Sequence, residues 1–198
     1  MMAHKSRWPV TIAMLTLVLA LGSVARAEDI EPAFEDQKST FDKQDRLHLD
    51  ATASLNAPLA KVYEAMSNPD KVAKYDAQIT GVKVLSKTAN GIVLEYSGRT
   101  LPIPNAPKTL QVKYTFDPAK NAITAQSGAK ALIQFRADYN LTASKDGKST
   151  EIHYTSVSSS PAKVLGMDTP PFMRRNAALQ TFMQGLHRTA QYLQSGGK

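Results

Sequence analysis

Alternating apolar and polar residues recur through much of the chain and predict a set of β-strands. Between Leu47 and Leu55 apolar residues occupy every second position, which is the period of a strand with one buried face. The same alternation returns in later stretches, and turn residues such as Asn90-Gly91 and Asp146-Gly147 separate neighbouring segments. Connections this short favour antiparallel hairpins. We therefore predict seven strands, at residues 47–55, 79–85, 92–97, 110–116, 122–127, 133–141 and 151–156.

A second period, of three to four residues, predicts one long helix over Thr169–Leu193. Thr169-Pro170-Pro171 is typical of a helix start, because a hydroxyl can cap free amides and proline costs little in the first turn. The apolar stripe consists of Phe172, Arg175/Asn176, Leu179, Phe182/Met183, Leu186, Ala190 and Leu193. The polar residues fall mostly on the opposite side: Arg174, Gln180, Gln184 and Arg188. Such a helix is about 37 Å long and needs an extended apolar partner.

Two short helical segments are predicted between the first two strands. Residues 58–66 place apolar side chains on one face, and Asn68-Pro69 then interrupts the helix before a second turn at residues 70–75. Every predicted strand has one apolar face, and the C-terminal helix is the long amphipathic element left to cover them. We expect an α+β fold in which a curved, seven-stranded antiparallel sheet wraps around that helix.

The N-terminal region follows neither pattern. An uncharged apolar run at residues 8–24 stands between basic residues and a small-residue cleavage site, so residues 1–27 are predicted to be a secretory signal peptide that directs the protein to the periplasm. An uncleaved membrane anchor is the alternative. Residues 28–46 are rich in acids and lack periodicity, so we expect a flexible leader. Residues 47–198 have the length of one domain.

The composition narrows the possible chemistry. The chain has no cysteine, so disulfides and thiolate sites are excluded. Its formal net charge is +7, which suits transient contact with an anionic membrane surface or ordinary solubility. Basic clusters with interleaved aromatic residues are missing, so nucleic acid is not expected as a partner. His48, Asp50 and His153 are predicted on wet strand faces, so we expect no metal site and no cofactor.

The first strand and the helix after it resemble a known family opening. The matching residues are Ser54-Leu55-Asn56-Ala57-Pro58-Leu59-Ala60-Lys61-Val62-Tyr63, followed by Asn68-Pro69-Asp70 and Tyr75. They are similar to the "apolar strand, Ala-Pro, x-x-x-Val-Tyr/Phe" opening of the polyketide cyclase/dehydrase and lipid transport branch of the START and birch-pollen-allergen-like (SRPBCC) superfamily. Many relatives place a tryptophan shortly after the position of Tyr75, where this chain has Asp76-Ala77-Gln78 instead.

The element order is also similar to the helix-grip fold of that superfamily, over roughly residues 47–194. The resemblance implies a hydrophobic cavity between sheet and C-terminal helix that holds a lipid, sterol, quinone, isoprenoid or polyketide. The candidate ligand-binding residues are inward-facing aromatic residues, apolar residues of the long helix and one arginine at a strand end: Tyr96, Tyr114, Phe116, Phe135, Tyr139, Tyr154, Met173, Leu179, Met183, Leu186 and Arg99.

Several of these features also have structural explanations. The tyrosines are common strand residues, and the methionines could simply fill a core. The proline-rich loop at residues 100–107 could cover the cavity or be a stiff connection. Arg99, Arg174 and Arg175 could meet an anionic headgroup or be solvated.

Three functions remain open from the sequence. Motifs for a serine nucleophile, a zinc protease, a phosphate loop or a dinucleotide site are missing, and the inward faces contain almost no ionisable group other than tyrosine. Our first hypothesis is therefore a non-catalytic carrier or sensor of a hydrophobic molecule. One alternative is an enzyme of the cyclase or aromatase type that uses tyrosine hydroxyls. The other is a protein-interaction module with a closed core, in which any interior cavity is smaller than about 300 Å³.

Overall fold

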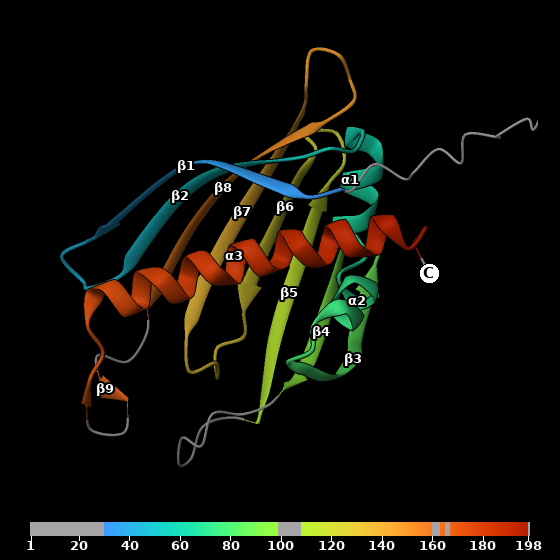
Figure 1. Ribbon diagram of the computed structural model, residues 1–198. Helices are drawn as coiled ribbons and strands as arrows, with labels where there is room; N and C mark the ends of the chain where they lie inside the picture. The colour runs from blue at the N-terminus through green and yellow to red at the C-terminus, as the bar shows by residue number, and fades with distance from the viewer. Residues whose placement is uncertain (1–29, 99–107, 160–162, 165–166, 198) are drawn as a thin grey trace, which may run out of the picture.

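A computed structural model of the protein describes residues 30–98, 108–159, 163–164 and 167–197. Within these ranges one large antiparallel sheet contains eight strands in the order β1-β2-β8-β7-β6-β5-β4-β3 (Figure 1). Short hairpins connect most sequence neighbours. The strands are β1 Pro32–Phe41, β2 Leu47–Leu55, β3 Ile79–Thr88, β4 Gly91–Gly98, β5 Thr109–Asp117, β6 Ala122–Ser127, β7 Gln134–Ala143 and β8 Thr150–Ser159; a separate two-stranded sheet pairs β9 Lys163–Val164 with β10 Met167–Asp168.

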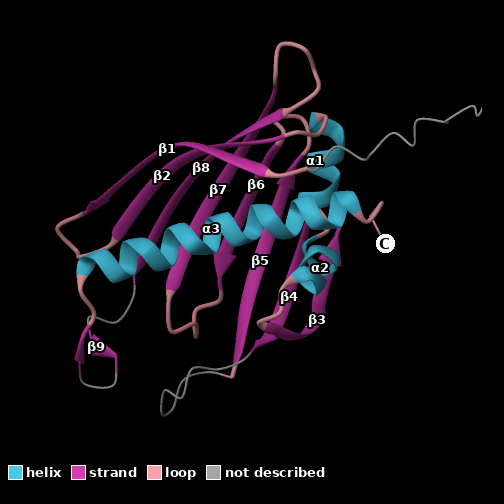
Figure 2. Ribbon diagram, in the orientation of Figure 1, coloured by secondary structure: helices cyan, strands magenta, loops and turns pink. Residues whose placement is uncertain are grey.

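The helices lie on one side of this sheet, and the longest crosses it (Figure 2). They are α1 Leu59–Met66, α2 Pro69–Val72, the 3-10 turn η1 Ala73–Tyr75 and α3 Pro171–Gln194. Prolines begin α2 and α3, as expected for a residue that lacks the N–H left unpaired in a first helical turn. The predicted hydroxyl cap of α3 is wrong, because Pro170 occupies the capping position and no side chain bonds to the free amides. None of the described helices is long and apolar enough to span a membrane.

The alternation read from the sequence places the buried faces correctly. In β2 the residues at every second position from Leu47 to Leu55 are buried, and Ile92 and Leu94 of β4 are buried in the same way. The inward residues of β7 and β8 follow the prediction, with Ala137, Leu141 and Ile152 all buried. The helix-grip architecture is therefore confirmed.

Strand β1 shows that two predictions were wrong: the number of strands and the flexibility of the whole acidic leader. Residues 32–41 pair along β2 as an edge strand, so the sheet has eight strands rather than seven and this part of the leader belongs to the fold. Most β1 side chains are exposed, including those of Glu35, Asp36 and Lys38, as is usual for an edge strand protected against further pairing. Its pairing relies on backbone hydrogen bonds, which explains why the side-chain pattern did not reveal it.

Arg174 also departs from the prediction, which placed it on the polar side of the helix. Its side chain is only 6% exposed, and it donates from Nη1 to Asp45 Oδ2 at 2.8 Å and from Nη2 to the Asp45 carbonyl oxygen. The guanidinium lies 4.6 Å from the centre of the Phe41 ring. Phe172 is instead 61% exposed, so the first turn of α3 is held to the end of β1 by an arginine rather than by its apolar residues.

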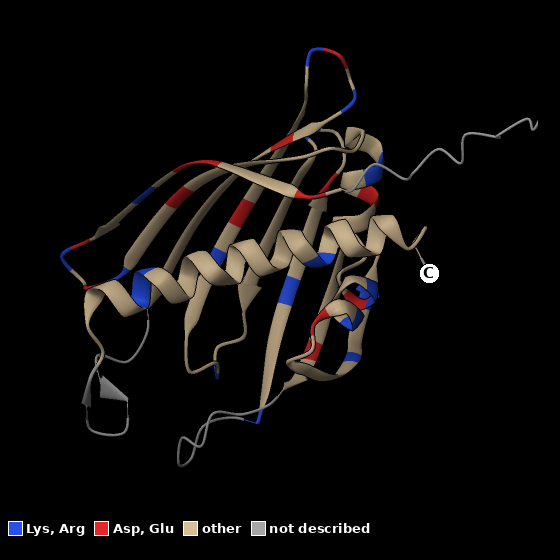
Figure 3. Cartoon of the chain, viewed as in Figure 1, with Lys and Arg blue, Asp and Glu red and all other residues tan. Residues whose placement is uncertain are grey.

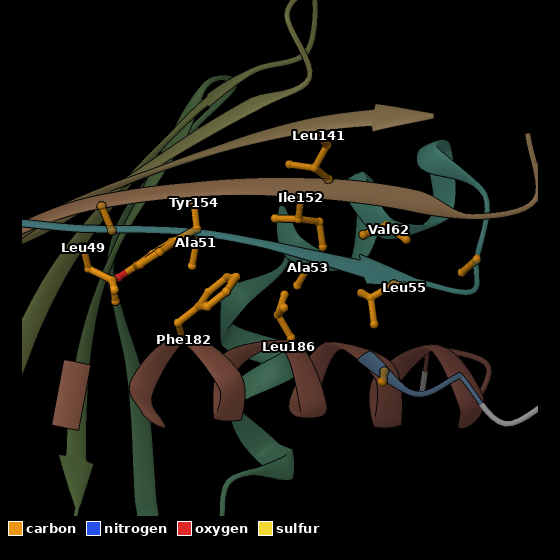
Figure 4. Close-up of a cluster of buried hydrophobic side chains, with 13 residues drawn as sticks. Leu49, Ala51, Ala53, Leu55, Val62, Leu141, Ile152, Tyr154, Phe182 and Leu186 are labelled. Atoms are coloured by element: carbon orange, nitrogen blue, oxygen red, sulfur yellow. The ribbon is translucent and has the colours of Figure 1, made fainter. Parts of the chain in front are cut away.

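One hydrophobic cluster fixes the middle of α3 against the sheet (Figure 4). Phe182 stacks on Tyr154 of β8 with ring centroids 4.3 Å apart, and Phe34 of β1 meets the same Phe182 ring edge-on at 6.0 Å. Leu186 is 1% exposed and packs in the same cluster. The helix is thus packed against the β1-β2-β8 end of the sheet and against α1.

Candidate ligand-binding site

A pocket of about 570 Å³ separates the C-terminal half of α3 from strands β4 to β7. The close backbone neighbours of α3 are β1, β2, α1, α2 and η1, while β4, β5 and β6 face it across the pocket. Because the helix is fixed at one end of a wide curved sheet, the pocket separates it from the inward faces of β4, β5 and β6. This pocket contradicts the interaction-module hypothesis, which predicted a closed core without a sizeable cavity.

Three tyrosines, which we call the tyrosine trio, bring hydroxyl groups to the sheet side of the pocket. Tyr96 of β4 and Tyr114 of β5 place their hydroxyl oxygens 2.9 Å apart in a hydrogen bond. Tyr139 of β7 lines the same pocket, and its hydroxyl has no hydrogen-bond partner among the described residues. Burial raises the pKa of Tyr96 to about 12, and it raises the pKa of Tyr114 and of Tyr139 well above the usual value. All three therefore carry their protons at neutral pH.

An ion pair completes the pocket on the helix side; Figure 3 shows where the charged residues lie along the chain. Arg188 of α3 donates from Nη1 to Asp76 Oδ2, and the two side chains are only 21% and 14% exposed. Arg188 Nε also donates to the carbonyl oxygen of Gln184 at 3.1 Å, and Asp76 Oδ1 accepts the backbone N–H of Gln78 at 2.8 Å. The positive charge of Arg188 offsets part of the pKa rise at each member of the tyrosine trio, so the ion pair and the phenols share one electrostatic environment.

The sequence analysis missed this ion pair. It assigned Arg188 to the outward side of the helix and expected almost no ionisable inward group other than tyrosine, and both expectations are wrong. A signal was present in the helix, because a second stripe of small and polar residues recurs every three or four positions beside the apolar one. That stripe, which lines the pocket, consists of Thr181, Gln184, Gly185, Arg188 and Thr189. Asp76 had no comparable signal.

The structure brings together five of the eleven predicted ligand-binding residues around the pocket: Tyr96, Tyr114, Phe135, Tyr139 and Leu186. Tyr154 and Leu179 pack in or against the hydrophobic cluster instead, Phe116 lies beyond the part of β5 that lines the pocket, and Met183 is half-buried outside it. Met173 is 52% exposed, at the end of α3 far from the pocket-lining stripe. Arg99 and the loop at residues 100–107 lie outside the described residues.

Apolar residues also surround the rim of the pocket. Leu132 and Ile133, just before β7, line it while remaining 41% and 47% exposed. Lys108 and Gly98 lie at the ends of the neighbouring strands and also contribute to the lining. The rim therefore combines exposed apolar surface with one basic side chain.

The histidines on the outer face of the sheet pair with carboxylates rather than with one another. His48 Nε2 lies 3.0 Å from Asp42 Oδ2, and His153 Nε2 lies 3.1 Å from Asp50 Oδ1. The hydrogen bond to His48 is the main reason why the pKa of Asp42 lies well below its usual value. Across the described ranges no three His, Asp or Glu side chains are grouped so as to hold a metal ion.

The fold is the helix-grip architecture that the sequence resemblance predicted, and solved structures share it. Among solved structures, the Zhui aromatase/cyclase from Streptomyces sp. R1128 superposes with a TM-score of 0.61 at 16% sequence identity, covering 74% of this chain and 92% of that chain. Ara h 8.0201 gives a TM-score of 0.57 at 14% identity, and covers 76% of this chain and 99% of its own. TTHA0849 from Thermus thermophilus gives 0.55 at 10% identity, with coverage of 76% and 99%. No family model matches the sequence, and neither does any curated protein.

Proposed function

We propose that the protein binds a hydrophobic small molecule in the pocket between α3 and strands β4 to β7, and acts as a carrier or sensor of that molecule. The observation that carries this proposal is a pocket of about 570 Å³ whose apolar lining is interrupted by the tyrosine trio and one ion pair. Mostly apolar pockets with a few convergent polar groups are typical of small-molecule sites, which span about 300–1,000 Å³. The lipid, sterol, quinone, isoprenoid and polyketide classes implied by the sequence resemblance all fit this description.

The energetics favour useful affinity without catalysis. Each 100 Å² of apolar ligand surface that leaves water contributes roughly 2.5 kcal/mol, against an association cost of several kcal/mol. A ligand that fills most of the pocket therefore has enough buried surface for measurable binding.

Ligand binding can be tested on the protein directly. Native mass spectrometry after gentle purification should detect a co-purifying small molecule, and the delipidated protein should gain thermal stability when lipids or quinones are added. Thr181→Trp places a large ring in the pocket and should weaken binding of the fluorescent probe N-phenyl-1-naphthylamine at least tenfold. Gln180→Trp, one residue earlier on the exposed side of α3, is the matched control. Absence of a bound molecule, of stabilisation and of any difference between the variants would refute the proposal.

A second candidate is an enzyme of the cyclase or aromatase type, as the Zhui protein is. The ion pair of Arg188 and Asp76 favours it, since protonated phenols and a guanidinium in a partly buried site can polarise a ligand carbonyl. In that case Tyr114→Phe and Tyr139→Phe should abolish conversion of a linear polyketone while the affinity for N-phenyl-1-naphthylamine is retained. Chromatography and mass spectrometry measure the conversion. Unconverted polyketone with the unmodified protein would exclude this candidate.

The site of action is also a proposal. Residues 1–27 have the features of a secretory signal peptide, so we infer that the protein acts in the periplasm. N-terminal sequencing of the protein from a periplasmic extract should begin at Glu28; a chain that keeps its N-terminus in the cytoplasmic fraction would contradict export. Residues 28–198 keep a formal net charge of +4, which supports transient contact with anionic membranes; flotation with phosphatidylglycerol vesicles can test this against neutral vesicles.

A further inference from the structure

The strong acceptors of the pocket are already engaged within the protein. Asp76 Oδ2 accepts from Arg188 and Oδ1 accepts from the Gln78 N–H at 2.8 Å. Two backbone carbonyl oxygens of α3 also have partners, since Thr181 and Thr189 donate their hydroxyl hydrogens to the carbonyl oxygens four residues earlier, at 2.8 and 2.9 Å. Asp76 is the one carboxylate among the described residues that line the pocket, so a ligand that enters meets no carboxylate oxygen without a hydrogen-bond partner.

Several donors remain available. Two hydroxyl groups that bond to each other use one hydrogen, so the Tyr96 and Tyr114 pair keeps a second hydrogen to donate. Tyr139 keeps its own, because its hydroxyl has no partner among the described residues. Arg188 has five N–H donors, of which Asp76 and the Gln184 carbonyl engage two. Its Nη2 lies beside Gly185 on the pocket-lining stripe, 3.7 Å from the point where a side chain at that glycine would begin.

The charge balance restricts the ligand further. Asp76 neutralises Arg188, so the interior of the pocket carries no net charge from this pair. Away from Lys108 at the rim, a carboxylate in the interior would have to compete with Asp76 for the guanidinium or remain an uncompensated charge in a mostly apolar site, which is costly. An uncharged acceptor avoids both problems.

We propose, building on the proposed binding function, that the pocket selects an uncharged apolar molecule that bears a carbonyl oxygen, and discriminates against carboxylates such as free fatty acids. The carbonyl oxygen accepts hydrogen bonds from Tyr139 and from the Tyr96 and Tyr114 pair, while the rest of the molecule packs on the apolar residues of β5, β7 and α3. Since burial holds the pKa of all three phenols above the usual value, these donors keep their hydrogens throughout the neutral range.

The test uses three probes that share one chain length: 2-undecanone, undecane and undecanoate, each competing with N-phenyl-1-naphthylamine at pH 7.5. One net hydrogen bond to an uncharged acceptor is worth roughly 2- to 10-fold in affinity. We expect 2-undecanone to displace the dye at a concentration at least fivefold lower than undecane and at least tenfold lower than undecanoate.

Variants locate the effect in the pocket. Tyr139→Phe should reduce the advantage of 2-undecanone over undecane at least threefold, whereas Tyr154→Phe, on the neighbouring strand but outside the pocket lining, should leave it unchanged. Asp76→Asn removes the charge that neutralises Arg188, so undecanoate should gain at least tenfold relative to 2-undecanone. Circular dichroism before each titration establishes that the variant is folded.

The outcomes separate the two proposals. If the dye binds but the ketone and the alkane compete equally, or if undecanoate competes best with the unmodified protein, the carbonyl preference is overturned and the binding function stands. If neither the dye nor any probe binds, the binding function itself fails and the preference fails with it. An unchanged ratio of undecanoate to 2-undecanone in Asp76→Asn would overturn the role assigned to charge neutralisation.

Discussion

Replacing Arg174 by methionine should loosen β1 from the rest of the protein. This arginine is the contact that holds the first turn of α3 to the end of β1, through two hydrogen bonds to Asp45 and the face of the Phe41 ring. Methionine keeps much of the unbranched apolar stem and removes the guanidinium. The Phe41 end of β1 should therefore lose its attachment to the helix, while the contact of Phe34 with Phe182 and the hydrophobic cluster around it stay packed.

The size of the effect follows from three contributions. The ion pair with Asp45 is discounted to roughly 1 kcal/mol, because the Asp45 side chain is 60% exposed and water screens it. The bond to the Asp45 carbonyl adds about 1–2 kcal/mol, and the contact with the Phe41 ring about 0.5–1 kcal/mol. Arg174 Nε is buried without a hydrogen-bond partner among the described residues, which costs free energy in the folded state. Removing Nε relieves this cost and offsets part of the stability lost with the three contacts. We expect a net loss of about 1–3 kcal/mol in the free energy of unfolding.

Urea unfolding and native-state hydrogen exchange measure the two aspects of this prediction. Amides of β1 should exchange markedly faster in Arg174→Met, whereas amides of β5 should change much less. The matched control is Arg175→Met, because Arg175 faces the same Phe41 ring at 5.3 Å but is exposed. The reasoning would be refuted by equal exchange of β1 in both variants together with stabilities within about 0.5 kcal/mol of each other.

Three further predictions concern the core, the pocket and a turn. Phe182→Ala should lower the free energy of unfolding by about 3–5 kcal/mol in urea titrations, since it empties the centre of the hydrophobic cluster; a loss below about 1 kcal/mol would contradict that packing. The pKa of Tyr96 is raised from 10.0 to about 12 in the folded protein, so the unfolded chain releases this proton first and stability should fall as pH rises from 10 to 12. Tyr96→Phe should make the decline in stability shallower, and a pH profile identical to that of the unmodified protein would refute this prediction. Gly91→Ala should destabilise the protein, because a Cβ at Gly91 would stand 2.7 Å from the Tyr114 carbonyl oxygen; Gly81→Ala, where the nearest contact is 3.7 Å, is the milder control, and equal thermal unfolding temperatures would contradict the clash.

The sequence was sufficient to predict most of the sheet and the helix that crosses it. The side-chain alternation in β2 and β4 predicts which residues are buried, because successive side chains of a strand point to opposite faces of the sheet. The length and apolar stripe of α3 likewise follow from local order alone, to within about two residues at its start. Such features depend only on residues that are close in sequence, so they can be predicted from the sequence alone.

The candidate site was only partly predictable for the same reason. Tyr96, Tyr114 and Tyr139 were identified because they lie on apolar strand faces. Arg188 and Asp76 were not, since the two are 112 residues apart and nothing in either local pattern indicates that they meet. Arg174 was misassigned because a helical period cannot distinguish a solvated arginine from one that finds a carboxylate and a ring on a distant strand.

The order of residues along the chain specifies which side of each strand and helix avoids water. Packing between distant segments specifies where those apolar sides touch and where they remain apart, because an apolar face has the same pattern whether it packs on a neighbour or lines a cavity. Long-range packing fixes α3 on β1, β2 and α1 and keeps it away from β4 to β6, and the pocket is the consequence of that placement.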